Sequence, residues 1–454
     1  MAHFHTLSHC PRGGAAWSSR TAAGLLLLIL MPALAAAQSD ALSLDAAIRL
    51  ALQNNERALA ADQRVAAADS RLTKARAFFM PTITLNGNYT RRPFEVPLTI
   101  GNQQVIVQAY NALSWSANFS MILFDSHSVP TLLGAGDDLS AERLNTADAK
   151  RKLAFEVGNA FLTTLSVDQV LQASQRRLEF AKQSLDAAKA RYAGGLVSVN
   201  DVTRAELEYA TAETGVVQGQ GQVETTYLQL GFLLNAPPPS KLAVPDLLLS
   251  AVEEKKAAQE DLIAQAQTRR PDVQSLRFRA RSMRAATIES TLKWFPTLSL
   301  TGRYSYTNEA GLTGRNFNWN AGLSMSWAIF DGFNRNGEYS ERMAVAYQAD
   351  LDLQAGLRKV EVDVRTALVS LGNQRAVLKQ STVAYDVAVR NAAETSELYR
   401  QGLSSALQVA DANVRLFEAS VALVQARYGL GIAYLNLEAA LGLDPLGKEP
   451  NVEN

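Results

Sequence analysis

Two long segments of the chain alternate between apolar and polar residues. The apolar positions are Leu113, Trp115, Ala117, Phe119, Met121 and Leu123 in the first segment, and Phe317, Trp319, Ala321, Leu323, Met325 and Trp327 in the second. Serine and asparagine fill most of the positions between them. A period of two places every apolar side chain on one face of a β-strand. The alternation therefore predicts one amphipathic strand in each half of the chain.

A shorter alternating run precedes each of these strands and predicts its partner. The apolar positions are Ile83, Leu85 and Tyr89 in one run, and Leu298, Leu300, Tyr304 and Tyr306 in the other. Each predicted strand has roughly ten residues, which is enough to cross a bilayer at a tilt. A strand of an ordinary β-sandwich would show the same alternation. No other segment nearby, however, alternates strongly enough to predict the second sheet that a sandwich needs.

Long helices are predicted between the strand pairs and after them. The stretches Leu139–Ala193 and Asn334–Arg400 contain no proline and are rich in strong helix formers. As helices they would be roughly 80 to 100 Å long, far more than a globular domain needs. Each stretch ends near a glycine. The other predicted helices are Leu44–Phe78, Val199–Leu234, Glu260–Lys293 and Ser405–Leu441.

The same elements and motifs occur twice along the chain, which indicates an internal repeat. The matching motifs are Phe79-Met-Pro81 and Phe295-Pro296, Phe124-Asp125 and Phe330-Asp331, and Arg191-Tyr-Ala-Gly-Gly-Leu196 and Leu398-Tyr-Arg-Gln-Gly-Leu403, with about 210 residues between the members of each pair. Three consecutive prolines, 237–239, mark a connector. We predict repeat 1 over 38–235, a Pro-rich connector over 236–256, repeat 2 over 257–444 and a C-terminal tail over 445–454.

The first 37 residues have the features of a secretory signal peptide. Arg12 and Arg20 precede the apolar run 22–30, and alanines follow at 33 and 35–37. A transmembrane anchor is the alternative, but the apolar run is shorter than an anchor needs. We predict a signal peptide over 1–37 that is cleaved after Ala37.

Composition excludes several kinds of site. The signal peptide would take with it the only cysteine, Cys10, and all histidines but His127. The rest of the chain offers no Cys/His cluster, nucleophile elbow or phosphate-binding loop, so we predict no enzyme, no metal and no cofactor. The 44 basic residues are balanced by 44 acidic ones, which argues against nucleic-acid binding.

Four membrane strands cannot close a barrel by themselves. An open sheet in lipid leaves unpaired backbone groups that each cost several kcal/mol. A symmetric oligomer removes the open edges. Two copies would give eight strands with a filled interior, whereas three would give twelve strands and leave a lumen. Trp115, Trp294, Trp319 and Trp327 lie in or beside the predicted strands and are expected at the membrane–water interface.

In their order and duplication, these motifs resemble the outer-membrane efflux protein (TolC) family over about residues 42–445. The resemblance implies an α+β membrane protein in the cell outer membrane. Its homotrimer would complete a 12-stranded transmembrane β-barrel, continued in the periplasm by a long α-helical barrel. It would be the passive exit duct of a tripartite efflux or type I secretion system, with a periplasmic adaptor (membrane fusion) protein and an inner-membrane pump as partners.

The resemblance also implies candidate gate and contact residues at the two helix bends. In the family an acidic ring and polar links close the periplasmic end. Asp411 matches one ring position and Gln408 the other, while Tyr399 and Asp201 match partners of a link whose arginine is replaced here by Ser404. For Asp201 helix capping is an equally good explanation, and for Asp411 a solvated helix surface. Residues expected to contact the adaptor are Gly195, Leu196, Gly402 and Leu403.

The main alternative is a periplasmic coiled-coil scaffold that binds envelope partners. Such a scaffold would explain the long helices but not the tryptophan-bearing strands. The exported cargo is left open among drugs, metal ions, small metabolites and polypeptides.

Overall fold

The computed structural model describes residues 41–101, 103–245, 259–309, 314–445 and 447–448. The predicted signal peptide over 1–37 lies outside the described residues, as do 246–256 of the predicted connector and most of the predicted tail. The described chain from residue 41 onward belongs to one compact unit.

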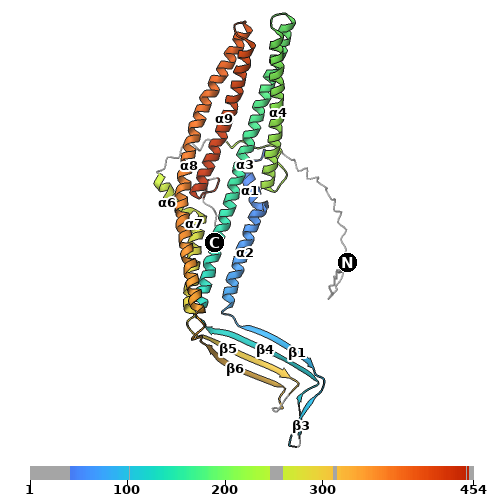
Figure 1. Cartoon of the computed structure of the whole chain (residues 1–454), viewed down its shortest axis with the longest axis vertical. Coiled ribbons are helices and arrows are strands. Elements are labelled where there is room, and N and C mark those ends of the chain that lie inside the picture. The colour runs from blue at the N-terminus through green and yellow to red at the C-terminus, as the bar shows by residue number, and fades with distance from the viewer. Residues whose placement is uncertain (1–40, 102, 246–258, 310–313, 446, 449–454) are drawn as a thin grey trace, which may run out of the picture. The chain divides into compact units, whose positions relative to one another are not determined.

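The two halves of this unit have the same order of elements, except that the first half contains one additional pair of short strands (Figure 1). The first half contains α1 (Leu44–Asn54), α2 (Glu56–Ala77), β1 (Thr82–Arg91), β2 (Val96–Ile100), β3 (Gln103–Gln108), β4 (Asn111–Phe124), α3 (Ser128–Ala193) and α4 (Val199–Leu234). The second half contains α6 (Gln259–Arg269), α7 (Pro271–Leu292), β5 (Thr297–Thr307), β6 (Phe317–Ser326), α8 (Asn334–Arg400) and α9 (Ala406–Leu441).

Two helices predicted as continuous are each interrupted once. The predicted helix Leu44–Phe78 breaks at Asn55, whose side chain accepts a hydrogen bond from Arg57 N at 2.9 Å and donates one to Leu233 O at 2.9 Å. Asn55 thereby ends α1 and caps α2. The predicted helix Glu260–Lys293 breaks before Pro271, which stands at the first position of α7. Proline is tolerated at that position because its missing N–H would have no helical partner there.

Two further predictions were wrong in extent. The first long helix begins at Ser128 rather than at Leu139, because Pro130 falls in the first turn of α3 and does not interrupt it. The segment between β1 and β4 was left without structure in the prediction, but it forms the antiparallel β2–β3 hairpin. Pro97 is unusual in a strand and argued against one here, and the structure has a register shift between Val96 and Pro97.

The four predicted strands form one antiparallel sheet in the order β1-β4-β5-β6. Directly opposed residues fall into rows that run across all four strands, and each row lies on one face. One row is Leu85, Ala117, Tyr304 and Trp319, and the next is Thr84, Asn118, Arg303 and Asn320. The predicted separation into an apolar and a polar face is thus confirmed. β1 and β6 are the two edges of this sheet.

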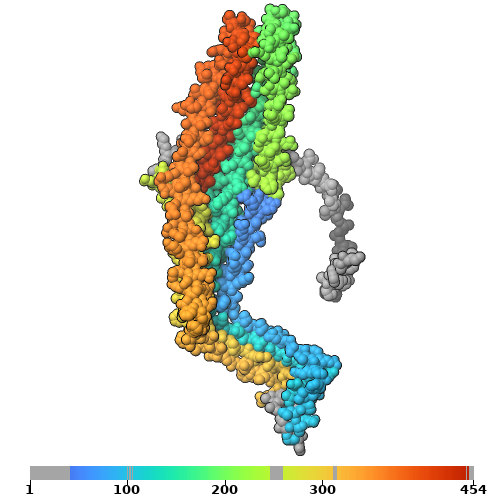
Figure 2. Space-filling model, viewed as in Figure 1, coloured from blue at the N-terminus to red at the C-terminus, as the bar shows by residue number. Residues whose placement is uncertain are grey.

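The helices pack along one another with a small-residue and leucine core. One buried cluster joins α1, α3 and α4 of the first half to α9 of the second, through residues such as Ile48, Phe161, Leu230 and Leu435. A second cluster lies among α6, α7, α8 and α9. Figure 2 shows α9 beside the upper part of α3, and the two helices share the first buried cluster, so the core crosses between the repeats. In the part of the chain that the structure describes, no helix is long and apolar enough to cross a membrane.

Candidate functional site

The apolar face of the sheet carries an aromatic cluster near the end that is distant from the helices. The Trp115 ring lies 5.7 Å from the Tyr304 ring and 6.3 Å from the Tyr306 ring, centroid to centroid. Phe317 lies 4.9 Å from Tyr306, and Trp319 beside them is 74% exposed. These distances are typical of favourable aromatic pairs. No other element of the described chain covers this face, so its rings and aliphatic side chains meet the surroundings of the subunit.

The other two tryptophans lie at the opposite end, where the sheet meets the helices. Trp327 Nε1 donates a hydrogen bond to Trp294 O at 3.0 Å. The guanidinium of Arg335 sits 4.3 Å from the Trp294 ring centroid. Aromatic residues therefore stand at both ends of the apolar face, with Ile83, Leu300 and Leu323 on the same face between them.

The Phe-Asp motif that ends each strand pair holds the start of the following long helix. Asp331 accepts hydrogen bonds from Arg335 N at 3.1 Å and from Arg335 Nε at 2.8 Å. Asp125 accepts from Ser128 Oγ at 2.8 Å and contacts the imidazole of His127. A carboxylate at a helix N-terminus accepts hydrogen bonds from free N–H groups, and its negative charge interacts favourably with the helix dipole. The duplicated motif thus fixes the strand-to-helix turn in both repeats.

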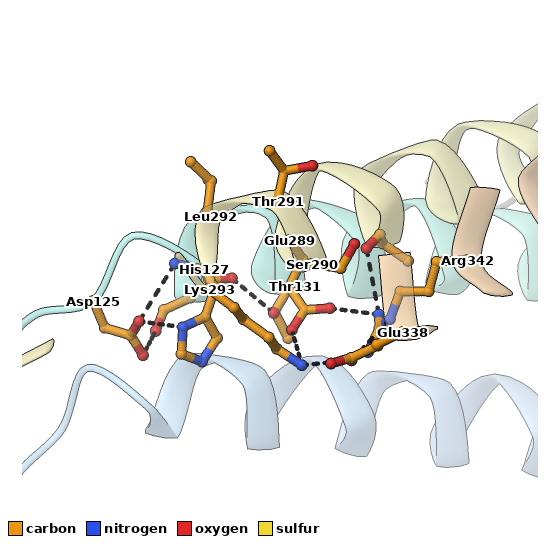
Figure 3. A network of polar contacts seen from close by, with 12 residues as sticks. Asp125, His127, Thr131, Glu289, Ser290, Thr291, Leu292, Lys293, Glu338 and Arg342 are labelled. Carbon is orange, nitrogen blue, oxygen red and sulfur yellow. Dashed lines mark hydrogen bonds and ion pairs between the residues drawn. The ribbon is translucent and has the colours of Figure 1, made fainter. Parts of the chain in front are cut away.

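His127 is part of this turn, as Figure 3 shows. Its ring makes an edge contact with Phe78, 6.1 Å between centroids. Among the described residues, no group of three or more His, Cys, Asp or Glu side chains could hold a metal ion.

A charged network joins α7 to α8 beside the sheet (Figure 3). Lys293 Nζ lies 2.6 Å from Glu338 Oε1 and 3.0 Å from Glu289 Oε1. Arg342 lies 2.7 Å from Glu338 Oε1 and also contacts Glu289. The hydrogen bond from Lys293 holds the pKa of Glu338 below its ordinary value. Burial alone would lower the pKa of Lys293, but its hydrogen bonds to the two carboxylates outweigh burial and raise that pKa.

The two helix bends at the far end of the bundle have the same construction. Gly195 and Gly402 adopt positive φ values of 71° and 76°, which glycine accepts without the steric cost of a side chain. Leu196 is 77% exposed and Leu403 is 73% exposed. The four residues predicted as adaptor contacts therefore lie on two neighbouring, exposed tips.

Asp201 and Gln408 occupy equivalent positions just after these bends. The Asp201 carboxylate accepts from Ser198 N at 3.1 Å, and Gln408 Oε1 accepts from Ser405 N at 2.9 Å. Each closes a capping box at the start of α4 or α9. The capping explanation offered for Asp201 matches this geometry, and the same geometry applies to Gln408.

Tyr399 is contacted from the opposite repeat, but by Arg191 rather than by Asp201. The Arg191 guanidinium lies 4.0 Å from the Tyr399 ring centroid, and its NH1 is 3.5 Å from Tyr399 O. Asp411 is exposed on α9 and lies 3.7 Å from Arg415 Nε. The sequence identified Arg191 only as the first residue of the duplicated bend motif and predicted no contact for it.

Arg177 on α3 has partners on two other helices. Its Nε and NH2 donate to Glu208 Oε1 at 3.0 Å and 2.8 Å. Its guanidinium also lies 5.0 Å from the Phe417 ring centroid on α9. Arg177 therefore joins α3 to helices of both repeats.

Comparison with known proteins agrees with this architecture. A family model described as outer membrane efflux protein matches residues 47–236 and 262–443. The outer membrane protein TolC of Vibrio cholerae is 24% identical over 402 residues, covering 86% of this chain and 89% of that protein. TolC of Escherichia coli is 24% identical over 397 residues, covering 83% of this chain and 77% of that protein.

Solved structures show the same fold. The outer membrane protein VceC of Vibrio cholerae superposes with a TM-score of 0.74 at 18% identity, covering 88% of this chain and 96% of that one. The outer membrane channel CmeC of Campylobacter jejuni superposes with a TM-score of 0.76 at 16% identity, covering 90% of this chain and 87% of that one.

Proposed function

The chain belongs to the outer membrane efflux protein family, and on this premise we propose that three copies form a passive exit duct through the outer membrane. The observation that carries the proposal is the four-stranded sheet with open edges at β1 and β6. Since β1 and β6 run in opposite directions, β6 of one copy can pair with β1 of the next in an antiparallel manner. Three copies then close twelve strands around a lumen, and every strand edge is paired.

The two faces of the sheet suit the two sides of such a barrel. β6 has ten residues, which corresponds to about 33 Å along the strand. At a tilt of about 40° the strand would span about 25 Å along the barrel axis, which matches the apolar band of a membrane barrel. The aromatic residues at both ends of the apolar face would lie at the two membrane–water interfaces. Serine, threonine and asparagine of the polar face would line a wet lumen.

The long helices would continue the duct into the periplasm. α3 has 66 residues and α8 has 67, so each is about 100 Å long. The exposed tips at Gly195–Leu196 and Gly402–Leu403 would meet a periplasmic adaptor, through which an inner-membrane pump delivers the cargo. Related proteins bear names such as "Probable efflux pump outer membrane protein TtgC" of Pseudomonas putida. The pump would supply the energy, and the duct itself would catalyse no reaction.

Mass and conductance test this proposal together. Protein extracted from outer membranes in mild detergent is expected to have three times the subunit mass by light scattering. In a planar bilayer it should conduct ions without any energy source. A stable monomer in detergent, or a trimer that never conducts, would contradict the exit-duct proposal.

Contact with the adaptor is tested separately by photocrosslinking from the tips. A photoreactive residue at Leu196 or Leu403 should capture a periplasmic adaptor in intact cells. The same residue at Leu85, on the apolar face of the sheet, is the matched control and should capture none. Equal capture from all three positions would exclude the tips as the adaptor site.

A further inference from the structure

The polar face of the sheet is almost free of charge. Its residues on β1 and β4 include Thr82, Thr84, Asn86, Asn88, Ser114, Ser116, Asn118 and Ser120, and those on β5 and β6 include Thr297, Ser299, Thr301, Ser305, Asn318, Asn320, Ser324 and Ser326. All are neutral hydrogen-bonding side chains. Within the four strands, Arg91 and Arg303 are the charged residues. They lie on different faces, which gives them different surroundings.

Arg303 stands near the middle of the polar face. It is directly opposed by Asn118 on β4 and by Asn320 on β6. The side chain is exposed, and no ion pair or hydrogen bond between described residues involves its guanidinium. No carboxylate neutralises the charge of Arg303, and the other side chains of this face add no charge that would oppose it.

Arg91 is also exposed, but it differs in its face of the sheet and in its contacts. It is the last residue of β1 and alternates with the apolar side chains rather than the polar ones. Its NH2 donates to Tyr110 Oη at 2.9 Å, and its guanidinium lies 4.8 Å from the Tyr110 ring centroid. Arg91 is therefore held at the rim of the sheet, outside the polar face.

We propose that Arg303 forms an anion-selective site in the lumen of the duct, where three copies of its guanidinium share one level with Asn118 and Asn320. This proposal rests on the trimeric duct proposed above. Symmetry places three unpaired positive charges at the same height around one axis. The guanidinium offers several N–H donors in a planar fork that fits carboxylate and phosphate groups, and the neighbouring amides can add hydrogen bonds.

The site gives a chemical preference to the barrel part of the passage, where the other side chains of the polar face are neutral. Anionic solutes, or the anionic groups of larger solutes, would be concentrated at this level, whereas small cations would be repelled. Asp411 at the other end of the helices carries the opposite charge. The duct would then have a positive ring in its membrane part and carboxylates near its periplasmic entrance.

Reversal potentials across a potassium chloride gradient test the site. Full-length trimers of the wild-type protein, Arg303→Gln and Arg303→Glu are reconstituted in planar bilayers. At about 0.1 M salt, Arg303→Gln should raise the potassium-to-chloride permeability ratio about threefold to tenfold, and Arg303→Glu should raise it further. At about 1 M salt the difference should largely disappear, since charges are then screened within about 3 Å.

Two further variants separate charge from structure. Arg303→Lys keeps the charge and should keep the wild-type ratio, and Arg91→Gln, the matched control, should also leave the ratio unchanged. If Arg303→Gln conducts with the wild-type ratio at low salt, or if Arg303→Lys loses selectivity as much as Arg303→Gln, the lumenal site is disproved. Absence of conductance in the wild-type protein would instead count against the duct itself.

Discussion

Arginine side chains make several of the contacts that cross between the two repeats. Arg151 donates to Ala439 O at 2.6 Å, Arg177 lies against Phe417, and Arg191 lies against Tyr399. These positions are spread along α3, so the first repeat is attached to the second at several heights. A long side chain with a planar head suits this role because it can reach a neighbouring helix and still pack against an aromatic ring.

Asp411 provides a prediction about the periplasmic end. If three copies of its carboxylate face a narrow passage, Asp411→Ala should lower the preference for cations in a planar bilayer by about twofold to fivefold at low salt. Arg415, at 3.7 Å, reduces the field of this carboxylate but does not remove it. Unchanged ion selectivity would show that Asp411 is an ordinary surface residue.

Arg335 provides a prediction about stability. This buried side chain donates to Asp331, Ala328 O and Lys293 O and also lies against Trp294. Arg335→Ala would leave a carboxylate and two carbonyl groups without these donors, at a cost of about 2 to 4 kcal/mol. Thermal unfolding followed by circular dichroism at a fixed scan rate should show a clearly lower Tm.

The control for this prediction lies on the same helix. Arg365→Ala removes an exposed ion pair with Glu361 one turn away. Such pairs contribute about 0.5 kcal/mol or less, so the Tm should change little. Equal losses in the two variants would mean that the contacts of Arg335 do not stabilise the junction.

The sequence predicted where the site residues lie better than it predicted which contacts they make. The sequence identified both bends and the residues beside them. It could not tell that Asp201 and Gln408 close the first turns of their own helices, because a capping box and an inter-helix link use the same kinds of side chain. The contacts of Arg191 with Tyr399 and of Arg177 with Phe417 could not be predicted, because each of these partners lies far away in sequence, in the opposite repeat.

At the scale of elements, strict periodicity made the strands predictable. The alternation over 113–123 and 317–327 identified β4 and β6 and the face that each presents. Helix ends were less predictable, since a single capping residue such as Asn55 divides a continuous helical pattern. Pro130 shows the opposite case, in which an apparent break is accommodated within the first turn of a helix.

The network that joins α7 to α8 predicts a dependence on pH. The pKa of Glu338 is lower in the folded protein than in the unfolded chain. Its contribution to the stability is therefore complete above the unfolded pKa and is lost as the pH falls through the folded pKa. Glu338→Gln should therefore lower the stability at pH 7 by about 0.5 to 1 kcal/mol, a modest effect for a partly exposed network. The difference from wild type should shrink as the pH falls through the lowered pKa of Glu338 in the folded protein.

Thermal unfolding at pH 7 and at low pH measures this dependence. Lys293 has the opposite dependence on pH. Its pKa is raised in the folded protein, so its contribution to the stability is lost as the pH rises above the ordinary lysine range. Glu361→Gln, which removes a carboxylate of an exposed pair, should differ little from wild type at either pH. A constant Glu338→Gln difference across the pH range would contradict the argument.

At the scale of the whole molecule, the sequence predicted a duplicated repeat, and both halves of the described chain contain a strand pair followed by two long helices. The need for partners follows from the physics of an open sheet. An open sheet alone does not determine the number of copies. The proposal of three copies also uses the size of the lumen and the family membership of the chain. The β2–β3 hairpin was missed because it is short and contains a proline and a bulge.

Closure between copies can be tested with disulfides, since the chain has a single cysteine, Cys10, in the predicted signal peptide. Thr84→Cys on β1 combined in turn with Asn318→Cys, Asn320→Cys or Ser324→Cys on β6 should give covalent dimers and trimers under oxidation in at least one register. Non-reducing gels measure this. A pair of cysteines on β1 and β4 should give crosslinked monomers instead. Failure of every β1–β6 pair would exclude the proposed closure.

The open edges of the sheet also govern what happens before assembly. A newly exported subunit presents two unpaired strand edges and an uncovered apolar face to water, which are the features that promote aggregation. Assembly of three copies depends steeply on concentration, whereas capture by a protease or a chaperone acts on one subunit at a time. We therefore expect the rate of synthesis to decide the yield, with slow expression favouring degradation of single subunits over insertion of complete channels.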